Sequence, residues 1–372
     1  MTETQNDLMR EATRLTRSGN LVEATALLQQ WLGGQTGTVV EQPSATTPIA
    51  DVLDGCVFET DLPREPVQAH AAPSRGEFIS GVHTHAALTR HYKLYIPPNI
   101  TAGEALPLVV MLHGCTQNPD DFAAGTGMNE RALQQKFFVL YPAQSQDANP
   151  SRCWNWFKHN HQQRDRGEPA LIASLTQAVL QSQPIDPARV YVAGLSAGGA
   201  MAAIVAAAYP DIYAAVGVHS GLAPGAATNM GEALSAMNGS GAGASIPPGI
   251  RPNTVSRKGP ALNVPTIVFH GDQDKTVNPV NGTQVMDARL ASHGAHSTAP
   301  KLEQGSSVKG RRFTKRVYQD ERGHVLGEHW LVQGAGHAWF GGHAAGSYTD
   351  ALGPDATGEM LRFFFEHPKR KS

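Results

Sequence analysis

The chain has 372 residues, 41% of them hydrophobic, and a formal net charge of −2 at pH 7. This length and apolar content are sufficient for a large buried core, and the near-neutral charge gives no electrostatic reason to expect binding to nucleic acid or to anionic membranes. The sequence contains no run of about 18 apolar residues, so we expect no membrane-spanning helix.

The N-terminal region differs from the rest of the chain. Residues 1–33 hold two amphipathic segments around a polar turn, which predicts a helical hairpin whose apolar faces need cover from the chain itself, a second copy or a partner. Residues 34–75 are rich in Gly, Thr, Pro and Ala, as is typical of a linker, so we assign residues 76–372 to the main domain. The polar, acidic start lacks the regions of a signal peptide, which favours a cytoplasmic location by default.

In the main domain, short apolar runs alternate with helix-forming stretches. Strands are expected near residues 90–96, 107–112, 137–141, 189–193, 213–218, 264–269, 313–319 and 328–333, and helices near residues 128–136, 168–182, 197–208, 281–292 and 355–366. This alternation predicts an α/β fold with a mostly parallel sheet covered by helices on both faces. Residues 222–262 interrupt it and are expected to form either a flap that faces the substrate or a surface excursion.

A tight turn between a predicted strand and a predicted helix carries the first candidate for chemistry. Gly194-Leu-Ser-Ala-Gly198 follows the apolar run at residues 189–193 and precedes the helix-forming run at residues 200–208. A G-x-S-x-G sequence on such a turn is the nucleophile elbow of α/β-hydrolases, where small residues let strand and helix approach closely. We therefore interpret Ser196 as a nucleophile; the alternative is a glycine-rich turn with an incidental serine.

The apolar run at residues 106–112 leads into a loop that begins His113-Gly114-Cys115. In α/β-hydrolases this loop and the residue after the nucleophile each supply a backbone N–H to the oxyanion hole. The sequence therefore predicts the amides of Cys115 and Ala197 as donors, with Gly114 allowing close approach. We expect His113 to order the loop through hydrogen bonds rather than to act as the catalytic base.

Two aspartates compete for the acid that orients the catalytic histidine. Asp272 and Asp274 both follow the strand predicted at residues 264–269. A carboxylate on a loop after a late strand is in the right place for this role. The H-G-x-x-D-x-x-V pattern favours Asp274 as the acid, with Asp272 capping the turn.

The candidate base follows the last predicted strand. His337 stands between glycines that let its loop reach across the sheet edge to the nucleophile, while His343, further along, is the nearest alternative. We favour His337 because it comes directly after the strand within this glycine frame. Serine, aspartate and histidine then occur in the chain order of α/β-hydrolases.

With these residues assembled, the chain resembles the poly(3-hydroxybutyrate) depolymerase family of esterases, which is related to bacterial feruloyl and acetylxylan esterases. The resemblance spans roughly residues 78–366 and implies a carboxylic-ester hydrolase without a cofactor that uses Ser196, Asp274 and His337. Much of that family is secreted, in contrast to the start of this chain. The motifs that carry the resemblance are Leu112–Gln117, Phe138–Pro142, Cys153–Phe157, Gly167–Pro169, Asp186–Met201 and Gly336–Trp339.

The expected substrate is a polyhydroxybutyrate-type polyester or its oligomers. A feruloyl or acetylxylan esterase is an alternative, because a catalytic triad does not choose the acyl or alcohol group. An acyltransferase is an alternative from another class, because it forms the same acyl-enzyme and resolves it with an alcohol.

Two cysteines and two tryptophans each have two interpretations. Cys115 and Cys153 both lie in motifs of the resembled family and are expected either to form a disulfide or to be buried thiols. Trp154 and Trp156 point the same way in an extended segment, so we expect them either to contact the substrate or to pack on the core. The spacing of zinc ligands is absent, and we expect no metal.

Overall fold

The computed structural model describes residues 75–239, 261–291 and 299–369 of the chain. The hairpin predicted at residues 1–33, nearly all of the linker predicted at residues 34–75, and much of the segment at residues 222–262 lie outside the described residues. Arg75–Ser372 forms one compact unit, which holds every element described below.

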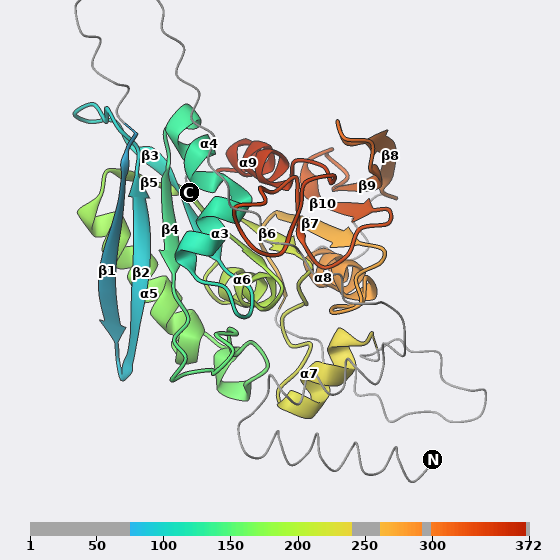
Figure 1. Ribbon diagram of the computed structural model, residues 1–372, viewed down its shortest axis with the longest axis horizontal. Coiled ribbons are helices and arrows are strands. Elements are labelled where there is room, and N and C mark those ends of the chain that lie inside the picture. The colour runs from blue at the N-terminus through green and yellow to red at the C-terminus, as the bar shows by residue number, and fades with distance from the viewer. Residues whose placement is uncertain (1–74, 240–260, 292–298, 370–372) are drawn as a thin grey trace, which may run out of the picture. The chain divides into compact units, whose positions relative to one another are not determined.

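A ten-stranded sheet runs through this unit in the order β1-β2-β4-β3-β5-β6-β7-β10-β9-β8 (Figure 1). The strands from β4 to β10 in that order are parallel, and antiparallel strands extend the sheet at both ends. Its strands are β1 (Glu77–His85), β2 (Leu88–Ile96), β3 (Leu106–Leu112), β4 (Phe138–Pro142), β5 (Ile185–Leu195), β6 (Ala215–His219), β7 (Thr266–Gly271), β8 (Lys301–Ser306), β9 (Arg312–Gln319) and β10 (Val325–Val332).

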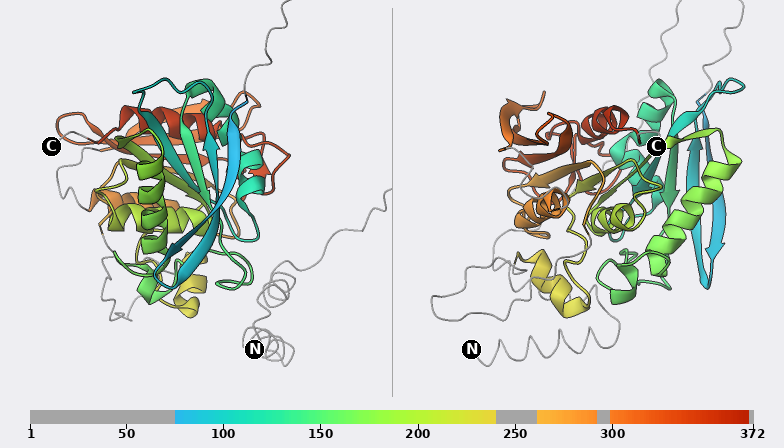
Figure 2. Two further views of the ribbon diagram at one scale, coloured as in Figure 1. Left: turned by 90° about the vertical axis from the view of Figure 1, so that its left-hand side faces the viewer. Right: turned by 180° about the vertical axis from the view of Figure 1, so that it is seen from behind.

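Helices cover both faces of the sheet (Figures 1 and 2). Residues of α5, α6 and α8 belong to the buried cluster on one face, and residues of α3, α4 and α9 belong to the cluster on the other. The remaining elements are α3 (Pro119–Thr126), α4 (Met128–Gln135), η1 (His159–His161), α5 (Gly167–Ser182), α6 (Ala197–Ala208), α7 (Met230–Met237), α8 (Val280–Leu290), β11 (Trp339–Phe340), β12 (Thr349–Asp350) and α9 (Ala356–Glu366).

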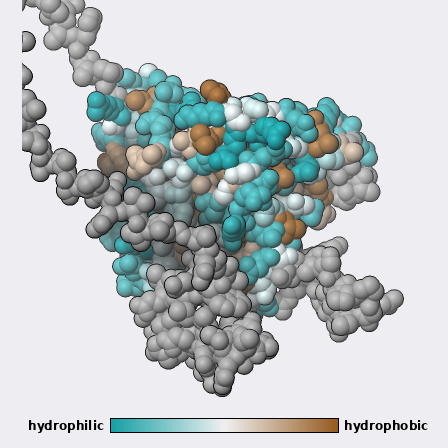
Figure 3. All heavy atoms as spheres, turned by 45° about the vertical axis from the view of Figure 1, so that its right-hand side comes forward, coloured by the Kyte–Doolittle hydropathy of each residue, from teal (hydrophilic) through white to brown (hydrophobic). Residues whose placement is uncertain are grey.

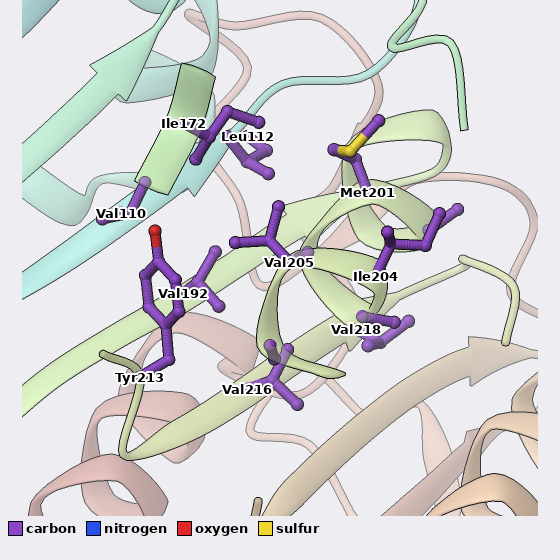
Figure 4. Close-up of a cluster of buried hydrophobic side chains, with 14 of the residues drawn as sticks. Val110, Leu112, Ile172, Val192, Met201, Ile204, Val205, Tyr213, Val216 and Val218 are labelled. Carbon is purple, nitrogen blue, oxygen red and sulfur yellow. The ribbon is translucent and has the colours of Figure 1, made fainter. Parts of the chain in front are cut away.

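The parallel strands supply apolar side chains to both faces, because successive residues of a strand point in opposite directions. In β3, Val110 and Leu112 join the cluster under α6, whereas Val109 and Met111 join the opposite cluster. Figure 4 shows part of the first cluster, in which side chains of β3, β5 and β6 meet those of α6. Two buried layers therefore hold the central strands in place.

The predicted α/β fold is confirmed. The helices and strands that the sequence did not predict lie mainly outside the central strands of the sheet. β1 and β8 were not predicted, since their side chains are largely exposed and lack an apolar run. The short helices α3 and α7 were also missed. α7 lies in the interrupted segment at residues 222–262, so part of that segment is helical.

On the face shown in Figure 3, the exposed apolar residues of the described part of the chain stand in separate small groups. Within the described residues, no helix combines the length and the hydrophobicity needed to cross a lipid bilayer.

Candidate active site

Ser196 occupies the turn between β5 and α6 and has an unusual backbone conformation, with φ 57° and ψ −120°. Residues with a side chain rarely adopt such angles, and they persist only where the surrounding structure enforces them. Two glycines make the turn possible. A Cβ on Gly198 would lie 2.0 Å from the carbonyl oxygen of Leu112, and one on Gly194 would lie 2.4 Å from the Gly198 backbone.

Asp274 and His337 meet although 63 positions separate them in the chain. Oδ2 of Asp274 lies 2.7 Å from Nδ1 of His337, and the carboxylate is fully buried. Oδ1 accepts hydrogen bonds from the backbone amides of Thr276 and Val277, each at 2.9 Å. Because those two amides hold Oδ1, the carboxylate keeps its second oxygen, Oδ2, directed toward the imidazole of His337.

The surroundings of Asp274 favour its charged form. Burial alone raises the pKa of a carboxyl group, but the neighbouring His270 and His337 and the Val277 amide outweigh it and hold the pKa of Asp274 well below its ordinary value. Asp274 is therefore ionised at neutral pH. It accepts a hydrogen bond from Nδ1–H of His337, which leaves Nε2 as the basic nitrogen.

Asp272, the competing aspartate, has a different partner. Its Oδ1 accepts a hydrogen bond of 2.7 Å from the backbone amide of Gly334, at the start of the loop that carries His337. The carbonyl of the same glycine accepts a hydrogen bond of 2.6 Å from Nη1 of Arg311. Asp272 and Arg311 thus fix the backbone of this loop at Gly334, one through its amide and the other through its carbonyl.

His343, the competing histidine, is exposed and lies 3.7 Å from Glu130. The structure therefore brings His337 to the buried aspartate, and it places His343 on the surface.

His219 connects the turn at Ser196 to the loop that follows His337, and the sequence did not identify it. Its carbonyl accepts the Ser196 amide at 2.9 Å, and its Nε2 accepts the Phe340 amide at 3.1 Å. Burial lowers the pKa of His219 well below its ordinary value, so the ring stays neutral and can accept this bond. Its position at the carboxyl end of the buried strand β6, next to the elbow strand, was the available signal.

The loop after β3 lies beside the elbow. A Cβ on Gly114 would stand 3.7 Å from Cβ of Ser196 and 3.5 Å from the Leu195 carbonyl oxygen. Within the described part of the chain, the amides of Cys115 and Ala197 donate no hydrogen bond to a protein acceptor. Ala197 is the first residue of α6, where a helix leaves its backbone amides without internal acceptors.

His113 orders this loop, as its position in the sequence suggested. Nδ1 lies 2.7 Å from the carbonyl oxygen of Gly114, and Nε2 accepts the Gln144 amide at 3.1 Å. Burial lowers the pKa of His113 to about 4, which keeps the ring neutral. With both ring nitrogens engaged, His113 is not available as a base.

A disulfide joins Cys115 to Cys153 across 38 positions of the chain. The next residue, Thr116, donates its amide to the Ser151 carbonyl at 2.7 Å. The two segments are thus tied together by a covalent bond and an adjacent hydrogen bond.

Trp154 and Trp156 are buried, with exposed fractions of 0% and 4%. Both belong to the apolar cluster under α6, as the packing alternative predicts. Neither ring presents an open face to a substrate, because surrounding core side chains already cover it.

Among the described residues, no group of three or more His, Cys, Asp or Glu side chains is arranged to hold a metal ion.

Comparison with known protein families gives one matching family model, described as esterase PHB depolymerase, over residues 90–304. Poly(3-hydroxyalkanoate) depolymerase C of Paucimonas lemoignei is 32% identical over 270 residues, which are 70% of this chain and 60% of that protein. Poly(3-hydroxybutyrate) depolymerase of Ralstonia pickettii is 29% identical over 66% of this chain and 50% of its own length. The chain therefore spans little more than half of these two relatives.

Other relatives act on different esters, according to their names. Acetylxylan esterase A of Talaromyces purpureogenus is 26% identical, and the matched region covers 72% of each chain. Among solved structures, an acetyl xylan esterase from Aspergillus awamori has a TM-score of 0.55 at 18% identity and covers 74% of this chain and 94% of its own. At that identity the structural likeness describes the fold.

Proposed function

Because the chain belongs to the esterase PHB depolymerase family, we propose that it is a serine carboxylic-ester hydrolase acting on a polyhydroxybutyrate-type polyester or its oligomers. The observation that carries this proposal is the buried Asp274 carboxylate bonded to His337, in a chain whose elbow presents Ser196. Such an aspartate–histidine pair is the part of a catalytic triad that prepares a serine for attack.

In the proposed reaction, Nε2 of His337 takes the proton of the Ser196 hydroxyl as Oγ bonds to the ester carbonyl carbon. Asp274 stabilises the resulting imidazolium and holds its orientation. When the tetrahedral intermediate collapses, the bond to the alcohol oxygen breaks and His337 returns the proton to that oxygen. Water then attacks the acyl-serine by the same steps and releases the acid.

The negative oxygen of the tetrahedral intermediate needs donors aimed at it. We assign this role to the backbone amides of Cys115 and Ala197. The amide of Ala197 lies at the N-terminus of α6, where the helix dipole adds a favourable positive potential. Gly114 supports the same role, because its missing side chain leaves room between the loop and Ser196.

An acetylxylan or feruloyl esterase is the second candidate. This candidate is favoured by coverage: 72% of the Talaromyces enzyme's own length matches this chain, whereas the match covers 60% of the Paucimonas depolymerase and 50% of the Ralstonia depolymerase. An acyltransferase would form the same acyl-serine but pass the acyl group to an alcohol.

Residues 1–33 are the subject of a further proposal: that they contact a second copy of the chain or a partner, because apolar faces are expected there.

A substrate comparison tests these candidates. The full-length protein and its Ser196→Ala variant are assayed with hydroxybutyrate oligomers, p-nitrophenyl esters of rising acyl length, acetylated xylan and methyl ferulate. We expect the highest kcat/KM with the oligomers and no Ser196-dependent transfer to an added alcohol. Preference for acetylated xylan or methyl ferulate would favour a carbohydrate esterase, and dominant transfer to the alcohol would favour an acyltransferase.

A further inference from the structure

Glu168, in the first turn of α5, is a buried acid that the proposed reaction does not use. Only 1% of its side chain is exposed. Oε1 accepts hydrogen bonds from the side-chain amides of Gln144, at 2.6 Å, and of Asn155, at 2.7 Å, while Oε2 accepts the Asn155 backbone amide at 2.7 Å. The guanidinium of Arg90, also buried, lies 3.4 Å from Oε1. A buried carboxylate with this many donors is held in a fixed position.

The amide of Gln144 can take only one orientation in this network. Its Nε2 donates to Glu168 and, at 3.0 Å, to the carbonyl of Cys153. Its Oε1 accepts from Nε of Arg90 at 2.9 Å and from the Ser145 amide at 3.1 Å. Turning the side-chain amide over would bring donors against donors and acceptors against acceptors. Glu168 therefore helps to fix Gln144.

Gln144 in turn sets the proton position on His113. The Gln144 backbone amide donates to Nε2 of His113 at 3.1 Å, so that nitrogen carries no proton. The proton of the neutral ring is on Nδ1, which lies 2.7 Å from the carbonyl oxygen of Gly114 and donates to it. A neutral imidazole has one donor and one acceptor, and both are used here.

The Gly114 carbonyl and the Cys115 N–H belong to one peptide group. A trans peptide is planar, with its carbonyl and its N–H pointing in opposite directions. The bond from His113 to the carbonyl, together with a longer one of 3.4 Å from the Gln117 amide, therefore also sets the direction of the Cys115 N–H. The preceding amide, that of Gly114, is held by Oε1 of Gln117 at 2.9 Å, so the glycine is anchored on both sides.

We infer that Glu168 is a positioning residue for the oxyanion hole, and that it acts on the Cys115 N–H through Gln144 and His113. This inference rests on the proposed function, since it assumes that Cys115 donates to the oxyanion. A loss of this alignment should reduce stabilisation of the tetrahedral intermediate and leave binding of the ester nearly unchanged.

The test is a double-mutant cycle in the full-length protein with Glu168→Gln, His113→Gln and the double variant. With p-nitrophenyl butyrate, we expect Glu168→Gln to lower kcat by about tenfold or more with KM changed less than about threefold, a part of what loss of a whole oxyanion donor costs. If Glu168 acts through His113, the double variant loses no more kcat than His113→Gln alone. Affinity for a trifluoromethyl ketone, whose oxygen becomes an oxyanion on Ser196, should fall in parallel with kcat.

Glu328→Gln is the matched control. Glu328 on β10 is also a buried glutamate, and it contacts the Arg362 guanidinium at 2.7 Å. Its loss should lower the melting temperature, but its effect on kcat should be small and additive with His113→Gln. If Glu168→Gln does not fold, Gln144→Leu removes the side-chain link to Glu168 but keeps the backbone amide that donates to His113 and the contact between Glu168 and Arg90. The same loss of kcat is expected from this variant.

The outcomes separate this inference from the proposed function. Full additivity between Glu168→Gln and His113→Gln, with an active wild type, would overturn the positioning role alone. Absence of Ser196-dependent hydrolysis in the wild type would overturn the proposed function. In that case nitrogen NMR of His113 still tests the positioning: Glu168→Gln should speed solvent exchange of the Nδ1 proton, and an unchanged rate contradicts the route.

Discussion

Nδ1 of His337 lies 2.7 Å from Oδ2 of Asp274, and the carboxylate in this pair is completely buried. Two backbone amides engage its other oxygen, so the aspartate has little freedom to turn away. A base whose ring is oriented by a fixed, ionised acid is suited to take a proton from a serine hydroxyl.

Ser196→Ala should abolish ester hydrolysis while the protein stays folded, because only one oxygen atom is removed from a turn that the surrounding glycines define. Turnover of p-nitrophenyl butyrate and the melting temperature measure the two effects. A fluorophosphonate should label the wild type at Ser196, as read by peptide mass spectrometry. Labelling of a different serine would contradict the assignment.

Asp274→Asn should lower kcat by about 10⁴, since an amide favours the wrong tautomer of the histidine. Asp272→Asn is the matched control on the same loop. Asparagine keeps a carbonyl oxygen that can accept the Gly334 amide, so we expect a loss of less than about tenfold. If Asp272→Asn is the more damaging variant, Asp272 is the acid.

Removing the disulfide with Cys115→Ser and Cys153→Ser should destabilise the protein by about 4 kcal/mol, the loop-entropy estimate for a closure of 38 residues. Urea unfolding monitors this change. Turnover should fall as well, because Cys115 lies in the loop that we propose supplies a donor to the oxyanion hole. Cys56, the third cysteine of the sequence, provides the control: Cys56→Ser should leave both the free energy of unfolding and turnover unchanged. An equal loss in Cys56→Ser would show that the effect does not come from the Cys115–Cys153 disulfide.

Stability should fall as the pH drops below about 6.5, because the fold keeps several buried histidines neutral. Burial lowers the pKa of His329 to about 3, and neither ring nitrogen of His329 has a hydrogen-bond partner among the described residues. The unfolded chain binds a proton at this side chain below its ordinary pKa of about 6.5, whereas the folded chain does not until about pH 3. The stabilisation is therefore complete above pH 6.5 and is lost as the pH falls toward 3.

His329→Leu should make this dependence shallower by up to about 1.4 kcal/mol per pH unit between about pH 5.5 and pH 4. Urea unfolding of wild type and variant at several pH values gives the two slopes. Identical slopes would mean that His329 takes up a proton in the folded protein as readily as in the unfolded chain.

Deleting residues 1–74 should leave turnover of small soluble esters nearly unchanged, because the candidate catalytic residues all lie within the compact unit Arg75–Ser372. Arg75 should be kept, since its carbonyl accepts a hydrogen bond of 3.0 Å from the Tyr95 hydroxyl. Gel filtration and assays on soluble and particulate ester compare the truncated and full-length proteins. Loss of small-ester turnover would place the N-terminal region in the packing of the core.

Local sequence was sufficient for the central strands and for the elbow at Ser196. A buried parallel strand needs a run of apolar residues, and a turn as tight as this one needs glycines at the positions where a Cβ would lie only 2.0–2.4 Å from neighbouring backbone atoms. The apolar run and the glycines of the turn are each visible within a few consecutive residues of the sequence. The outer strands β1 and β8 have no such requirement, since most of their side chains are exposed and none is fully buried, and the sequence did not predict them.

Other features depend on contacts between distant segments. The sequence placed Asp272 and Asp274 on the same loop, but the partner of each carboxylate lies about 60 positions away, at Gly334 and His337. The sequence left two alternatives for Trp154 and Trp156, substrate contact or packing on the core, and the tertiary structure buries both rings in the core. His219 gave only a weak local signal, because its role comes from joining Ser196 to Phe340.

The sequence by itself determined the fold class, the order of the candidate catalytic residues and the position of the strained turn, because periodicity and backbone sterics act over a few neighbouring residues. Only the tertiary structure decided which aspartate meets His337, which aromatic rings are covered, and how Glu168 connects through Gln144 to His113. Those outcomes depend on hydrogen-bond direction and burial, which arise when segments remote in the chain are brought within about 3 Å of one another.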